Sequence, residues 1–291
     1  MSDASSIVYL NGEFLPIEEA RVPVLDRGFI FGDGIYEVVP VYGGMPFRWE
    51  QHHARLVRSL GRIRIDDPLD PEGWRTLVHT LVARHPWPDQ FVYLQVTRGV
   101  ARRDHAFPQG VRPTVFGMSS PLPPVPLALL EHGVAAITLA DERWLHCDIK
   151  STSLLGNVLA RQAAVDAGAV ECVMFRDGFL TEGSSSNLWV VRGGWLLAPP
   201  PDRLILQGIR YGLLESLAQG EGIPFEQRPV GRAEVEGADE LLLSSATREV
   251  LPITRLDGRP VGAGVPGPVF RRLHAAYQRA KAGNRAGHAA R

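Results

Sequence analysis

The sequence has very few lysines. Lys150 and Lys281 are the two lysines among 31 basic residues, and arginine supplies the others. Arginine can replace lysine where only a positive charge is needed, but a guanidinium stays protonated and cannot attack a carbonyl. A lysine retained against this bias is a candidate for amine chemistry. Lys281 lies in a small, polar C-terminal stretch and is expected to be solvated, so Lys150, between an apolar strand and an apolar helix, is the candidate.

Cysteine is also scarce. Cys147 and Cys172 are too few for a disulfide framework or a four-thiolate metal site, and they form no CxxC pair. Both are expected to be buried and reduced. No metal site is expected either, because the adjacent His52 and His53 point to different faces of a predicted helix, as on an ordinary surface helix.

Neither sign of charge predominates, since 31 basic residues face 32 acidic ones. There is no global field to attract nucleic acid or an anionic membrane. No apolar run approaches the roughly 20 residues of a membrane-spanning helix, and residues 1–10 lack the features of a signal peptide. We therefore expect a cytoplasmic protein that acts on small molecules and binds neither nucleic acid nor a membrane.

Proline is concentrated in the stretch SSPLPPVP, where four prolines keep the backbone extended. This stretch predicts a linker at residues 119–127, between an N-terminal domain of residues 1–118 and a C-terminal domain of residues 128–280. Residues 281–291 are expected to form a disordered tail. With 291 residues, 45% of them hydrophobic, the chain can bury one large core or two ordinary ones.

The hydrophobic patterns predict an α/β protein. The first half reads as an α+β domain with antiparallel strands and two helices, the second of them capped by Asp70. The second half mixes short hairpins with helices, which favours a barrel-like α/β domain over a doubly wound sheet. Residues 262–267 fit GxGxxG but lack a βαβ unit around them, so a loop is predicted there.

Four segments combine polar and apolar residues in ways that chemistry could use. They are DRGFIFGDGIYEVV (26–39), RWLHCDIKS (143–151), TEGSSSN (181–187) and LSSATRE (243–249). In the second, partial desolvation would lower the pKa of Lys150 and make a neutral amine accessible. The fourth runs from a strand into hydroxyls and exposed amides, as anion-binding turns do.

The order of these segments resembles that of the fold type IV aminotransferases, which use pyridoxal 5′-phosphate. The resemblance runs from about Ile7 to Tyr277, and it is closest to the D-amino-acid aminotransferase group, as QVTRG, LLGNVLA and the RxH of residues 103–105 also show. It implies transfer of the amino group of a D-amino acid, D-alanine or similar, to a 2-oxo acid such as 2-oxoglutarate.

The resemblance assigns roles around the cofactor ring. Lys150 would be the Schiff-base lysine and would shuttle the proton during the reaction. Glu182 would accept a hydrogen bond from the pyridine nitrogen and keep it protonated. Leu206 would pack against the ring, and Arg143 would lie near the phenolic oxygen.

The resemblance also implies a phosphate site and a substrate site. The phosphate would be bound by Arg55, by amides near Ile209 and Arg210, and by the turn at Ser245 and Ala246. The substrate carboxylate would be bound by Tyr36, Arg103 and His105. The loop that carries Arg103 and His105 would be contributed across a homodimer interface.

The chain departs from the family pattern at the phosphate site. Arg210 and Tyr211 follow Ile209, where the family commonly has a threonine and an arginine, and Ala246 replaces a common threonine. Other functions within the fold are an (R)-selective amine transaminase, a branched-chain L-amino-acid aminotransferase and an aminodeoxychorismate lyase, against all of which the RxH loop argues. A non-catalytic scaffold protein would be expected to lack Lys150 or Glu182, and both are present.

Overall fold

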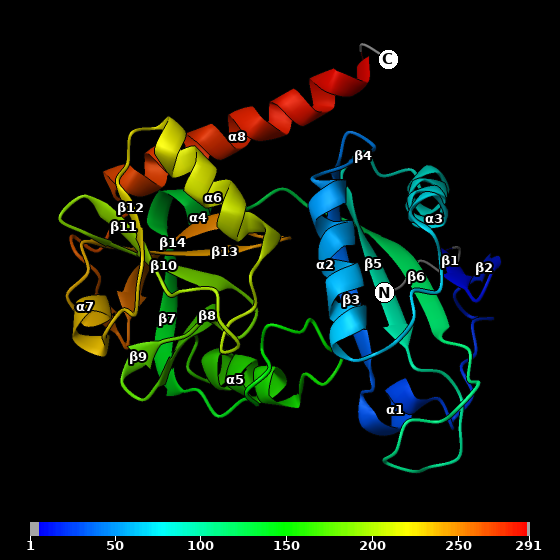
Figure 1. Ribbon diagram of the computed structural model, residues 1–291. Helices are drawn as coiled ribbons and strands as arrows, with labels where there is room; N and C mark the ends of the chain where they lie inside the picture. Colours follow the sequence, from blue (N-terminus) through cyan, green and yellow to red (C-terminus); the bar gives the residue numbers. More distant parts are fainter. Residues whose placement is uncertain (1–5, 290–291) are drawn as a thin grey trace. The chain divides into compact units, whose positions relative to one another are not determined.

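The computed structural model describes residues 6–289, with side chains through residue 283 (Figure 1). The chain forms two compact units. The first extends to Pro123 and takes in the short segment Ile149–Leu154, and the second holds Pro124–Asp148 and Leu155–Gly283. Lys150 therefore belongs with the N-terminal unit, whereas the sequence placed it in a domain of residues 128–280.

The first unit is built on a six-stranded antiparallel sheet in the order β2-β1-β6-β5-β3-β4. Its elements are β1 (Ile7–Leu10), β2 (Glu13–Pro16), α1 (Arg27–Phe31), β3 (Gly34–Tyr42), β4 (Met45–Pro46), α2 (Trp49–Arg62), α3 (Pro71–Ala83), β5 (Gln90–Thr97) and β6 (Thr114–Pro121). The predicted cap is present, since the Asp70 carboxylate accepts a hydrogen bond from Gly73 N at 2.7 Å. This half has the α+β organisation that its sequence predicts.

Strand β6 is longer than predicted. Ser119, Ser120 and Pro121 pair with β5, so residues predicted to begin the linker belong to the sheet. The proline is the last residue of the strand, where the ladder ends and its missing N–H costs little.

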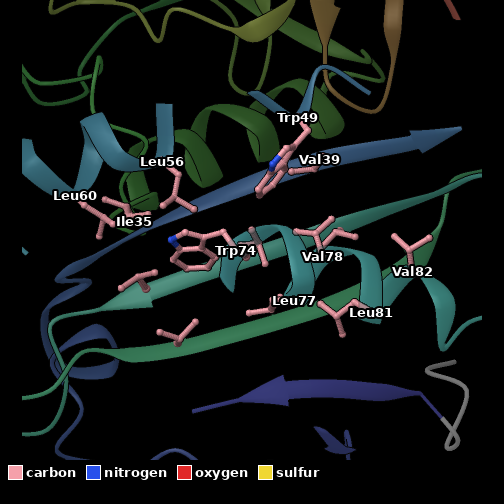
Figure 2. Packing of buried hydrophobic residues seen from close by; sticks show 14 of the residues in the cluster. Ile35, Val39, Trp49, Leu56, Leu60, Trp74, Leu77, Val78, Leu81 and Val82 are labelled. Atoms are coloured by element: carbon pink, nitrogen blue, oxygen red, sulfur yellow. The ribbon is translucent and has the colours of Figure 1, made fainter. Parts of the chain in front are cut away.

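The core of the first unit lies between its sheet and the helices α2 and α3. Figure 2 shows Trp74 of α3 near Leu56 of α2, and Val39 of β3 beside Trp49 of α2, all buried. Burying one side chain of this size stabilises the fold by about 2–3 kcal/mol. Because α2 packs on β3, this core fixes the strand that carries Tyr36.

The second unit contains a nine-stranded mixed sheet in the order β12-β11-β10-β13-β14-β7-β8-β9, with β15 paired to β14. Its elements are α4 (Leu127–His132), β7 (Val134–Ala140), α5 (Leu155–Asp166), β8 (Glu171–Arg176), β9 (Phe179–Leu180), β10 (Asn187–Arg192), β11 (Trp195–Ala198), α6 (Ile209–Gly220), β12 (Phe225–Gln227), α7 (Arg232–Glu236), β13 (Glu240–Ser245), β14 (Glu249–Leu256), β15 (Arg259–Pro260) and α8 (Pro268–Ala289). Parallel pairs (β7 with β8 and β14) stand beside antiparallel hairpins. No helix among residues 6–289 is long and apolar enough to cross a membrane.

The C-terminal end differs from the prediction. Helix α8 continues through Ala289, so residues 281–289 are helical, and residues 290 and 291 of the predicted tail lie outside the described residues. Lys281 is not a solvated tail residue, because its ammonium pairs with the Glu249 carboxylate and its side chain is 15% exposed. The small, polar composition of this stretch concealed the partner that β14 provides.

Candidate functional site

The backbone of Lys150 is fixed by the beginning of strand β3. Tyr36 N donates a hydrogen bond to Lys150 O at 2.9 Å, and Thr152 N donates to Gly34 O at 3.0 Å. The backbone N–H and C=O groups that bond here lie on the edge of β3 opposite β5, where strand β5 cannot provide partners for them. Buried backbone groups need such partners. The Lys150 ammonium nitrogen lies 4.1 Å from the centroid of the Tyr36 ring. The structure thus brings together the lysine and the tyrosine that the sequence selected.

Arg55 is held by a buried carboxylate that the sequence analysis missed. Glu37, on β3, accepts hydrogen bonds from Arg55 Nε at 2.6 Å and Nη2 at 3.0 Å, and its other contact is His52 Nδ1 at 2.8 Å. Burial alone would raise the pKa of Glu37, but the charge of Arg55 and the contact with His52 lower it to about 2. The interpretation of His52 as a surface-helix residue is wrong, since it is 1% exposed.

Replacing Glu37 by glutamine should lower the free energy of unfolding by about 3 kcal/mol at neutral pH, because the Arg55 charge would stay buried without its carboxylate. The pKa of Glu37 is lowered from 4.5 to about 2 on folding. Its contribution is therefore present above pH 4.5 and is lost as the pH falls through about 2. Urea denaturation of the wild type and the variant at several pH values measures both effects.

The matched control is Glu50→Gln, which removes a carboxylate that pairs with Arg75 on the surface at 3.0 Å. An exposed pair contributes at most about 1 kcal/mol, so this variant should unfold almost like the wild type. Equal losses in the two variants would contradict the assignment of a strong buried pair to Glu37.

The glycine-rich segment before β3 forms a support for the RxH loop. Asp26 caps the short helix α1, and Gly32 ends it with a φ of 65° that favours glycine. Arg27 makes two hydrogen bonds here. Its Nε donates to the Asp33 carboxylate at 2.7 Å, and its Nη1 donates to Asp104 O at 2.5 Å. Helix α1 thus anchors the loop at its middle residue.

Phe31 brings the two residues of the RxH motif together. The guanidinium carbon of Arg103 lies 5.3 Å from the centroid of the Phe31 ring, and the ring of His105 lies 5.4 Å from it. Both polar side chains are exposed, so they remain accessible to a ligand. The sequence selected Arg103 and His105 but not Phe31, although an aromatic residue between two glycines of the first segment was a signal.

In the second unit, Glu182 is the centre of a buried polar cluster. Its Oε1 accepts a hydrogen bond from Arg143 Nη1 at 2.5 Å, and its Oε2 accepts from Leu206 N at 3.0 Å. Arg143 is in turn fixed by Asp141, which accepts from Nε at 2.9 Å and from Nη2 at 2.8 Å. Asn187 donates to Leu206 O at 2.8 Å and closes the cluster.

The environment gives Glu182 an unusual proton affinity. Burial raises its pKa to about 7, although the charge and hydrogen bond of Arg143 and the amide of Leu206 favour the charged form. Burial alone would lower the pKa of Arg143, but its hydrogen bonds to Asp141 and the charge of Glu182 raise it. Arg143 therefore stays cationic, and Glu182 can accept a proton or bind a cationic N–H group.

The serines after Glu182 fold around a second buried carboxylate, Glu171. Glu171 Oε1 accepts a hydrogen bond from Ser184 N at 2.8 Å, and Oε2 accepts from Ser186 Oγ at 2.9 Å. Arg248 Nη1 lies 3.8 Å from Oε2. Glu171 was not among the residues predicted from the sequence, although a carboxylate within an otherwise apolar strand was a signal.

Four of the predicted phosphate residues lie at the N-terminus of α6 and in the turn after β13, a group that we call the anion cup: Ile209, Arg210, Ser245 and Ala246. The N-cap residue of this helix is Gly208, which makes no side-chain cap hydrogen bond, and backbone amides at a helix N-terminus are suited to an anion. Arg210 Nη2 donates to Ala246 O at 3.2 Å, which joins the helix to the turn after β13. In that turn, Ser245 Oγ accepts a hydrogen bond from Arg248 N at 3.2 Å.

This set of residues fits pyridoxal phosphate. A buried carboxylate with a raised pKa suits a pyridinium N–H, and a helix N-terminus beside a turn with serine suits a phosphate. The Glu182 carboxylate and the N-terminus of α6 are adjacent, because Asn187 contacts both. Its amide nitrogen donates to Glu182 and to Leu206 O, and its Oδ1 lies so close to Gly208 that a Cβ there would be 2.3 Å away. Among the described residues, no group of three or more His, Cys, Asp and Glu side chains could hold a metal ion.

Comparison with known proteins places this arrangement in a family. The chain matches the model of "Amino-transferase class IV" over residues 34–256. It is 39% identical over 271 residues to the D-alanine aminotransferase of Bacillus licheniformis, an alignment that covers 93% of this chain and 95% of the relative. The chain belongs to the class IV aminotransferase family. The D-alanine aminotransferase of Staphylococcus aureus (strain COL) is 40% identical over 273 residues, with 94% and 96% covered.

Solved structures of class IV aminotransferases have the same fold. The T.th. branched-chain amino acid aminotransferase with pyridoxamine 5′-phosphate superposes with a TM-score of 0.91 at 26% identity, covering 97% of this chain and 95% of that one. The branched-chain enzyme of Escherichia coli gives 0.88 at 24% identity, with 94% of each chain covered. The predicted fold type IV is confirmed, as are the enzyme class and the cofactor, an aminotransferase that uses pyridoxal phosphate and acts on small amino and oxo acids.

Proposed function

We propose that this aminotransferase moves the amino group of a D-amino acid such as D-alanine to a 2-oxo acid such as 2-oxoglutarate, in a ping-pong reaction. The observation that carries this proposal is similarity over 93–94% of the chain to D-alanine aminotransferases of two organisms, at 39% and 40% identity. The RxH loop held on Phe31 supports the same substrate class.

Pyridoxal phosphate supplies, when bound, a ring that accepts electrons from the substrate Cα. Glu182 accepts the hydrogen bond of the ring nitrogen, and Arg143 and the Leu206 amide hold its carboxylate in place. Lys150 is the Schiff-base lysine, and its Nζ moves the proton of the substrate Cα. Leu206 packs against the ring. Arg143 contacts Glu182, and a position near the phenolic oxygen remains a prediction for it.

The phosphate is bound by the anion cup, through the amides of Ile209 and Arg210 and the turn at Ser245 and Ala246. Arg55 adds a guanidinium that Glu37 orients. In this chain the arginine at 210, with its bond to the turn, takes the place of the hydroxyl that the family commonly has there.

Arg103, His105 and Tyr36 bind the substrate α-carboxylate. A guanidinium is suited to a carboxylate because it donates two parallel hydrogen bonds. We further propose a homodimer, in which the loop with Arg103 and His105 completes the site of the partner, and a cytoplasmic location.

The experiment on the function is a comparison of two amino donors. The purified holoenzyme is mixed with D-alanine or with L-leucine, and the change of the cofactor absorbance is recorded before and after 2-oxoglutarate is added. D-alanine alone should change the spectrum. A response to L-leucine alone would favour a branched-chain aminotransferase, the activity named for the similar solved structures, and a protein that cannot bind the cofactor would contradict the proposal.

The carboxylate site is tested by Arg103→Ala. This variant should lower kcat/KM for D-alanine about 100-fold, because the charge-assisted bonds to the carboxylate are lost. Turnover of an (R)-amine without a carboxylate, if the wild type has any, should not fall. The control is Arg102→Ala, which changes the neighbouring arginine, also exposed. Unchanged D-alanine turnover in Arg103→Ala would rule out this role.

A further inference from the structure

The turn that follows β13 has an unusual backbone. Ser245 pairs with Glu249 across a hairpin whose turn residues are 246–248. Glu249, the first residue of β14, follows this turn and has a φ of 57°, in the left-handed region. Glycine is favoured in this conformation, because a Cβ is strained there. A residue with a Cβ persists at such a position only where its surroundings hold it.

Two side chains of helix α8 hold Glu249. Lys281 Nζ donates a hydrogen bond to Oε1 and forms an ion pair with it. Gln278 Nε2, three residues earlier on the helix, donates to Oε2 at 2.7 Å. Glu249 is 6% exposed, so its carboxylate needs a charged partner at this depth. The second lysine of the chain supplies that partner.

The other end of the same turn lies in the anion cup. Ser245 and Ala246 begin it, and Ala246 O accepts the bond from Arg210 of α6. Glu249 follows Ala246 by three residues, so a shift of Glu249 would move the turn against the helix N-terminus. The Lys281–Glu249 ion pair and the Gln278–Glu249 hydrogen bond thus link helix α8 to the turn, and the Tyr277 ring of the same helix lies 5.5 Å from the Arg210 guanidinium.

We propose that Lys281 is a positioning residue for the cofactor phosphate. By pairing with Glu249 it keeps the turn after β13 in the conformation that places Ser245 and Ala246 beside the N-terminus of α6. This inference rests on the proposed phosphate site.

The test is the affinity of the full-length chain for pyridoxal phosphate, measured after removal and titration of the cofactor. Lys281→Met keeps most of the aliphatic stem and removes the charge, and it should weaken binding about tenfold, because the cup is no longer held in place. At saturating cofactor, kcat with D-alanine should stay close to that of the wild type. Inorganic phosphate should raise the unfolding temperature of the cofactor-free chain, and this increase should be smaller in Lys281→Met than in the wild type.

Three further variants separate positioning from general stability. Lys281→Arg should restore binding, since it keeps the charge. Arg279→Met removes an ion pair between the same helix and Glu221, away from the turn, and should bind the cofactor like the wild type. Glu249→Gly relieves the backbone and removes the carboxylate, so adding Lys281→Met to it should have no further effect.

Equal cofactor affinity in Lys281→Met and the wild type would overturn the inference, while D-alanine turnover by the wild type would leave the proposed function standing. An equal loss in Arg279→Met, or a full Lys281→Met effect on the Glu249→Gly background, would also overturn it. A wild-type chain that binds no pyridoxal phosphate would overturn both proposals.

Discussion

Replacing Lys150 by arginine should reduce transamination about 10³-fold or more, although the positive charge is kept. A guanidinium does not lose its proton at neutral pH, so it can neither bond to an aldehyde nor move the substrate proton. The backbone hydrogen bond between residue 150 and Tyr36 does not depend on the side chain of residue 150, so the fold should be preserved. Steady-state rates with D-alanine and 2-oxoglutarate measure the loss of activity, and thermal unfolding shows whether the fold is preserved.

The control for this exchange is Arg75→Lys, which makes the reverse substitution at a surface site whose arginine side chain is 43% exposed. It should leave the rate unchanged. If the Lys150→Arg enzyme kept a substantial rate, the amine of Lys150 would not be required and the catalytic assignment would be wrong.

Replacing Glu182 by glutamine should lower kcat about 100-fold, since a neutral amide does not keep the ring nitrogen protonated. The substitution keeps the size of the side chain, and the Arg143 guanidinium keeps its bonds to Asp141. Loss of activity should therefore occur in a folded protein that still binds the cofactor. Cofactor titration measures binding, and the rate with D-alanine at saturating cofactor measures catalysis, so the two experiments separate a loss of binding from a loss of catalysis.

The cofactor-free chain offers an independent measurement on Glu182. Folding raises its pKa from 4.5 to about 7, so its stabilising contribution is present below pH 4.5 and is lost as the pH rises through about 7. The loss amounts to about 3 kcal/mol in the free energy of unfolding. Glu182→Gln should remove this pH dependence.

Glu234→Gln is the matched control, because Glu234 pairs with Arg228 at the surface and the pKa of Glu234 is lowered to about 2 by that hydrogen bond. It should change neither kcat nor the pH dependence of the stability between pH 4.5 and 7, because Glu234 is ionised in both the folded and the unfolded chain over most of this range. A Glu182→Gln enzyme with wild-type turnover would contradict the role of Glu182 at the ring nitrogen.

Much of the fold could be predicted from local patterns. The apolar spacing of Leu56 and Leu60 and the cap at Asp70 mark two helices of the first unit, because both signals act within a few residues of the chain. The Asn11-Gly12 turn marks the first hairpin for the same reason. The extent of β6 could not be predicted, since the pairing of Ser119 with β5 overrides the preference of a proline-rich stretch.

The buried charged residues could not be predicted in the same way. Glu37, Glu171 and Glu249 read as ordinary acidic residues until the fold shows the cation or the serines that face each of them. Their partners are separated from them by 13 to 32 residues along the chain. The position of such a partner depends on how strands and helices pack, which no local pattern records.

By itself, the sequence determined the family, the cofactor and the candidate lysine, because the residues that bond to a cofactor must have particular chemical groups in a particular order. Tertiary structure alone decided that Lys150 joins β3 of the first unit, that Glu182 lies among Arg143, Asn187 and Leu206, and that Lys281 reaches Glu249. The physical reason is that burial and charge pairing depend on distance in space, and only the packed chain sets those distances.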